Sequence, residues 1–89
     1  MSTREKVKVV KSIMFHYHLR KGENTQYCRV IDKTLSLMPV ELGEFFMRDF
    51  DAPLDKHWWV GLYSPASYHS YRAKAVDFFI NCLRLQRML

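Results

Sequence analysis

Apolar residues recur every three to four positions through nearly the whole chain, and this spacing constrains the fold more than any other feature. Only three Gly and three Pro interrupt the 89 residues, which disfavours a many-stranded sandwich with frequent tight turns. The chain is also too short for two independent cores. We therefore predict an all-α fold: a single helical domain over residues 1–89, built as a small bundle of four to five helices with a C-terminal helix-turn-helix.

Start and stop signals divide this pattern into helices over residues 4–20, 25–37, 39–50 and 65–82, with a shorter one over 55–62. Gly22 suits the position after a helix, and Pro39 ends one helix and begins the next. Ser64 and Pro65 suit the N-cap and first turn of the last helix, and Asp55 is the expected cap of the short one. Between residues 49 and 55, clustered aspartates predict a polar loop.

The helical spacing also predicts which side chains face the core. In the first three helices these are Val7, Val10, Met14, Tyr17, Tyr27, Val30, Ile31, Leu35, Leu42, Phe45, Phe46 and Phe50. In the last helix they are Tyr68, Tyr71, Ala75, Phe78, Phe79, Cys82 and Leu83.

Charge is unevenly distributed along the chain, whose net charge is +5. Residues 1–22, predicted as a basic N-terminal helix, carry six Lys and Arg against one acid, and residues 56–89 carry five against one. The middle of the chain, residues 23–55, has seven acids and three Lys and Arg. Basic ends suit a polyanion such as nucleic acid, although solvated helix faces also carry many lysines.

The predicted helices 55–62 and 65–82 match the order of a helix-turn-helix unit over residues 55–83, in which the second helix enters the major groove of DNA. The outward face of that second helix is small, polar and cationic. Ser and His side chains bond base edges or phosphates, and Arg can bond guanine through two nitrogens. The DNA-binding candidates are Ser64, Ser67, His69, Ser70, Arg72 and Lys74, with Lys56 and His57 from the preceding helix.

Two stretches resemble known DNA-binding proteins. IDKTLSLMPVELGEFFMRDF (residues 31–50) resembles a helix boundary and the following helix of sigma-factor region-four-like domains. YSPASYHSYRAKAVDFF (residues 63–79) resembles the recognition helix of ArpU/RinA-type phage transcriptional regulators. The residues at matching positions in the second stretch are Ser64, Ser67, Tyr68, Ala75, Val76 and Phe79.

This resemblance implies a small phage transcriptional regulator that binds double-stranded DNA, with Ser67, His69 and Ser70 facing the bases. Ser70 stands where the family usually has Arg, and Ala73 stands where it has Lys. The basic N-terminus, Arg4 to Lys11, would then supply the missing phosphate contacts.

A second reading is a protein-binding regulator or inhibitor that acts on RNA polymerase or another host protein without touching DNA. Trp58 and Trp59 are adjacent, so both cannot face inward, and an exposed Trp is typical of a binding surface. Leu85 and Leu89 extend an amphipathic end that could dock on a partner or form a homodimer.

Other function classes find little support in the sequence. His16 and His18 point apart on a helix, and no paired metal-ligand motif is present, so no metal or other cofactor is expected. No catalytic motif indicates an enzyme. Cys28 and Cys82 are expected to be free thiols, and the lack of a signal peptide or membrane span predicts a cytoplasmic protein.

Overall fold

The computed structural model describes residues 1–51 and 56–88 of the chain. These residues form α1 (Thr3–Arg20), α2 (Gln26–Leu37), α3 (Val40–Phe50) and α4 (Pro65–Leu85), with no strand among them. The all-α prediction is confirmed, and each of the four longer helices begins within one residue of its predicted start. None of the described helices is apolar over a length that could cross a bilayer.

Capping side chains and a glycine mark the ends of the first two helices. Ser2 caps α1 by accepting a hydrogen bond from the amide of Glu5 at 3.2 Å, and Gly22, just beyond this helix, has a φ of 97° that favours glycine. Thr25 caps α2 by accepting a hydrogen bond from the amide of Cys28 at 3.2 Å. The chain therefore turns at defined points between helices.

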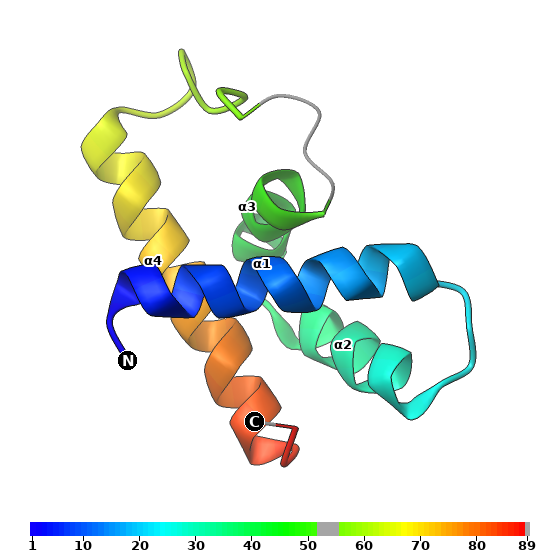
Figure 1. Cartoon of the computed structure of the whole chain (residues 1–89). Coiled ribbons are helices and arrows are strands. Elements are labelled where there is room, and N and C mark those ends of the chain that lie inside the picture. Colours follow the sequence, from blue (N-terminus) through cyan, green and yellow to red (C-terminus); the bar gives the residue numbers. More distant parts are fainter. Residues whose placement is uncertain (52–55, 89) are drawn as a thin grey trace.

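Helix α4 is the centre of the bundle. It contacts all three other helices, and α1 crosses it, as Figure 1 shows. Phe79 of α4 stacks on Phe46 of α3 with ring centroids 4.7 Å apart. The buried side chains of α4 are Tyr68, Ala75, Val76, Phe79, Ile80 and Leu83.

The buried face of α4 is rotated from the predicted one. Tyr71, Phe78 and Cys82 were expected in the core but are half-buried, whereas Val76 and Ile80 are fully buried. The prediction placed Tyr71 and Phe78 in the core because their side chains are large and aromatic. The face of α4 that α1, α2 and α3 cover instead includes the smaller aliphatic residues Val76 and Ile80. This rotation also brings Arg72 toward the interior.

The predicted helix over residues 55–62 is wrong for the part that the structure describes. Residues 56–63 form successive turns, with Gly61 at a φ of 88° and an isolated bridge between Val60 and Tyr63. The predicted cap Asp55 lies outside the described residues. A helix this short is only marginally stable by itself. The packing of Trp58 and Trp59 against the core decides the conformation of this segment instead. The predicted helix-turn-helix is therefore not confirmed.

Candidate nucleic-acid interface

Two of the predicted DNA-binding serines form the N-cap of α4. Ser64 Oγ accepts a hydrogen bond from the amide of Ser67 at 3.1 Å and donates one to Ser67 Oγ at 3.0 Å. Both residues are exposed, but their hydroxyls already bond each other. Their observed role is to begin the helix.

The other outward candidates on α4 are exposed as predicted. His69, Ser70 and Lys74 all face solvent. The ring of His69 lies edge-on to Tyr68 with centroids 5.2 Å apart, and the Lys74 ammonium lies 5.9 Å from the centre of the Tyr71 ring. In the preceding turns Lys56 and His57 are also exposed.

Arg72 does not face outward as predicted. Its side chain is only 20% exposed, and its Nε lies 3.0 Å from Oδ2 of Asp49, whose side chain is 5% exposed. The two oppositely charged groups form an ion pair, and neither of these two atoms has a hydrogen-bond partner within residues 1–51 and 56–88. The guanidinium also lies over the rings of Phe50, at 5.2 Å, and Tyr68, at 5.7 Å. A large part of its charge is therefore compensated inside the protein.

Asp49 is a buried residue of α3, whereas the clustered aspartates of the sequence predicted that it would begin a polar loop. Its Oδ1 accepts hydrogen bonds from the indole of Trp58 at 3.1 Å and from the hydroxyl of Tyr68 at 2.7 Å. Burial raises the pKa of Tyr68, and the hydrogen bond to the Asp49 carboxylate raises it further. The spacing of the residues could have revealed that Asp49 faces inward. It follows the core residues Phe45 and Phe46 by four and three positions, so it lies on the same face of the helix.

Both tryptophans pack onto this network, which corrects the prediction that one of them is exposed. Trp58 lies edge-on to Phe45 with centroids 5.3 Å apart, and Trp59 stacks on Tyr68 at 4.3 Å with an interplanar angle of 13°. Each ring is half-buried. Among the protein-interface candidates, Leu85 is 84% exposed and Leu89 lies outside the described residues.

A basic stripe runs along one flank of α1. Arg4, Lys8 and Lys11 are spaced to share one face of the helix, and all three are exposed. None of them forms an ion pair within the described parts of the chain. Lys6, on another side of the helix, instead binds Asp77 of α4 at 2.8 Å.

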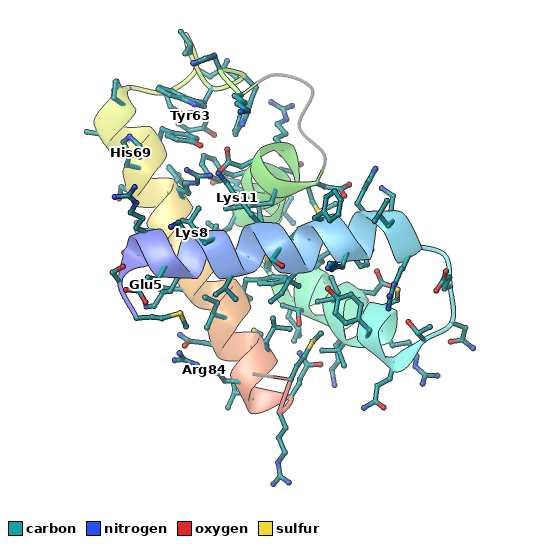
Figure 2. The ribbon with its side chains drawn as sticks, in the orientation of Figure 1. Glu5, Lys8, Lys11, Tyr63, His69 and Arg84 are labelled. Carbon is teal, nitrogen blue, oxygen red and sulfur yellow. The ribbon has the colours of Figure 1, made fainter. Side chains whose placement is uncertain are left out.

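The stripe faces the first turns of α4 across a cavity of about 440 Å³, which we call the basic groove. Figure 2 shows Lys8 and Lys11 projecting from α1 on the side where His69 of α4 lies. The residues that line the basic groove are Thr3, Arg4, Val7, Lys8, Lys11, His69 and Arg72. Residues from opposite ends of the sequence thus form one cationic surface.

A second cavity, of about 600 Å³, adjoins the basic groove, because Lys11 and Arg72 line both. We call it the aromatic pocket, after the rings of Phe15, Phe50, Trp58 and Tyr68. The ionisable residues at its walls are Lys11, His18, Asp49, Lys56 and Arg72. Sequence reasoning missed this pocket, although Phe15 continues the spacing of Arg4, Lys8 and Lys11 on α1.

The described residues contain no group of three or more His, Cys, Asp and Glu side chains that could hold a metal ion. Cys28 is buried, Cys82 is half-buried, and both thiols are free.

The fold and this surface define a small all-α protein with a cationic groove. Comparisons with protein-family models, curated proteins and solved structures find no match.

Proposed function

We propose that this protein is a small DNA-binding regulator that holds the phosphate backbone in the basic groove. The observation that carries the proposal is the position of Arg4, Lys8 and Lys11. These exposed cations lie opposite His69 of α4 and have no acidic partner among the described residues. Lys and Arg side chains supply most phosphate contacts to DNA, and each neutralised phosphate releases counterions.

The role proposed for α4 follows from its place beside this stripe. Its first turns expose His69 and Ser70, which can bond base edges, and α1 rather than a preceding short helix would hold α4 against the duplex. Arg72 contributes less than its type suggests, because Asp49 compensates its charge. Phosphate contacts from α1 are therefore expected to dominate the affinity.

The test is the salt dependence of binding to a fluorescent duplex. The observed association constant of a protein that contacts Z phosphates falls with a log–log slope of about −0.9Z. Replacing Lys8 and Lys11 with Ala should weaken binding at about 50 mM salt and make the slope shallower by about 1 to 2 units.

Lys33→Ala combined with Arg84→Ala is the matched control. Both residues are exposed and lie outside the basic groove. Replacing them lowers the net charge by the same amount as replacing Lys8 and Lys11. The control should keep nearly the wild-type slope. A wild type that fails to bind the duplex at low salt, or a control that loses as much as the Lys8 and Lys11 variant, would refute the proposal.

A further inference from the structure

The aromatic pocket has the size and the lining of a site for one planar, charged ligand group. Its volume of about 600 Å³ falls within the range of about 300–1,000 Å³ common for small-molecule sites. Aromatic rings form much of its wall, and Lys11 and Lys56 are its exposed cations. An apolar wall with cations beside it suits a group that is both planar and attached to an anion.

Phe15 is the residue of this pocket that the fold does not explain. It is 61% exposed on α1, and the other three residues of its stripe are the cations Arg4, Lys8 and Lys11. Its one ring contact in the described structure is with the adjacent His16, at 5.7 Å. A large apolar ring left in water next to Lys11 stabilises the fold little, and it remains available for a ligand.

The opposite wall of the pocket is fixed in place. Asp49 accepts hydrogen bonds from Trp58 and Tyr68 and pairs with Arg72. These contacts hold the rings and the guanidinium in one arrangement before any ligand arrives, so little side-chain freedom remains to be lost on binding. Asp49 is thus a positioning residue for the pocket.

We infer that the aromatic pocket receives an unpaired nucleobase from a single strand of nucleic acid whose phosphates lie in the basic groove. The inference rests on the proposed function, since the groove must hold the backbone. Lys11 and Arg72 line both cavities, so a strand that leaves the groove meets the pocket directly. Phe15 offers its ring to the base, and Lys11 and Lys56 accompany the neighbouring phosphates.

A single strand fits these features better than a duplex or an acidic peptide. Every base has a π-face, and exposed aromatic rings in a basic groove are the common way to bind single strands. In a duplex the bases are paired and stacked, and none is free to enter the pocket. An acidic peptide would satisfy the lysines but would leave the ring of Phe15 without a planar partner.

The experiment measures the fluorescence anisotropy of four labelled probes. The three nucleic-acid probes have the same length of about 12 nucleotides, and the fourth is a peptide. They are a mixed-sequence single strand, the same strand with abasic sites, the matching duplex and a polyglutamate peptide. Base stacking on an aromatic side chain predicts that the intact strand binds about 5- to 100-fold more tightly than the abasic strand. The intact strand should also bind more tightly than the duplex and the peptide.

Three variants separate stacking from charge and from folding. Phe15→Leu should reduce affinity for the intact strand to that for the abasic strand while leaving the salt slope unchanged, because no phosphate contact is lost. Phe15→Trp should retain the preference for bases. Leu85→Ala, which removes an apolar side chain that is even more exposed than Phe15 and lies outside the pocket, should behave as the wild type. Circular dichroism melts check that all three variants fold.

The outcomes distinguish the two proposals. If the duplex does not bind even at low salt, the proposed function fails and this inference, which rests on it, fails with it. If duplex, intact strand and abasic strand bind equally and Phe15→Leu changes nothing, the base pocket is refuted while DNA binding by the groove stands. Binding of polyglutamate as tight as that of the intact strand also refutes the base pocket. A free nucleoside monophosphate is added as an unlabelled competitor; if it binds as tightly as the strand, the occupant is the free nucleotide and the strand is refuted.

Discussion

Oδ2 of Asp49 lies 3.0 Å from Nε of Arg72, so a carboxylate on α3 holds the arginine that the sequence places on the DNA-facing side of α4. Oδ1 of the same carboxylate accepts hydrogen bonds from Trp58 and Tyr68. One acidic residue thus joins α3, α4 and the turns between them. We expect this cluster to matter more for stability than for direct contact with DNA.

Replacing Arg72 with Ala should therefore destabilise the fold. The variant leaves the buried Asp49 carboxylate without its cation, and we expect the free energy of unfolding to fall by about 1–3 kcal/mol. Lys74→Ala, on the exposed side of α4, should change it by no more than about 0.5 kcal/mol. Urea denaturation measures both. If Arg72→Ala is as stable as Lys74→Ala but binds DNA more weakly, Arg72 is a DNA contact and not part of the core.

Trp58 and Trp59 allow one substitution to be compared at two adjacent positions. Trp58→Phe removes the donor of the hydrogen bond to Asp49, whereas Trp59→Phe keeps an aromatic ring that can stack on Tyr68. Because hydrogen bonds to charged groups are worth about 1.5–3 kcal/mol, Trp58→Phe should lower the free energy of unfolding by about that much more than Trp59→Phe. Urea denaturation of the two variants gives the difference. Equal losses would mean that packing alone matters at both sites.

Ser64 was predicted to contact DNA, and its observed bonds suggest a different result for its variant. Ser64→Ala removes the N-cap of α4 and should lower the free energy of unfolding by about 1 kcal/mol. The affinity of the folded protein for DNA should stay unchanged. Ser70→Ala, on the exposed face of the same helix, is the control with little effect on stability. Weaker DNA binding by Ser64→Ala at unchanged stability would restore the original assignment.

The helices could be predicted from the sequence because their signals are local. The spacing of Val10, Met14 and Tyr17 and the cap at Ser64 depend on near neighbours, and these predictions hold in the structure. The same reasoning gave a wrong result for residues 56–63. A short helix is only marginally stable by itself, so long-range contacts decide the conformation of this segment. The hydrogen bond that the Trp58 indole donates to Asp49 is such a contact, and no local pattern reveals it.

The candidate site was predicted only in part for the same reason. The excess of cations near the N-terminus was visible in the sequence, and it indicated phosphate contacts from Arg4 to Lys11. That these cations face His69 depends on how α1 crosses α4, which periodicity does not determine. The burial of Arg72 likewise depends on an acid more than twenty positions earlier in the chain.

Alkaline pH should destabilise the protein through two buried tyrosines and one that is half-buried. Burial raises the pKa of Tyr17, Tyr27 and Tyr68, and the carboxylates of Asp32 and Asp49 raise those of Tyr17 and Tyr68 further. Unfolded tyrosines ionise near a pKa of about 10. Above that pH the folded state therefore holds more protons than the unfolded state, and the stability that these groups contribute at lower pH is lost as pH rises.

The free energy of unfolding should fall above about pH 10, by up to about 1.4 kcal/mol per pH unit for each of these tyrosines. Tyr68→Phe should be less stable than the wild type at neutral pH, because Asp49 loses a hydrogen-bond donor. Its stability should nevertheless decline less steeply above pH 10, since one shifted group is gone. Urea denaturation between pH 8 and pH 11 tests the slope, and a Tyr68→Phe curve parallel to the wild type would contradict the raised pKa of Tyr68.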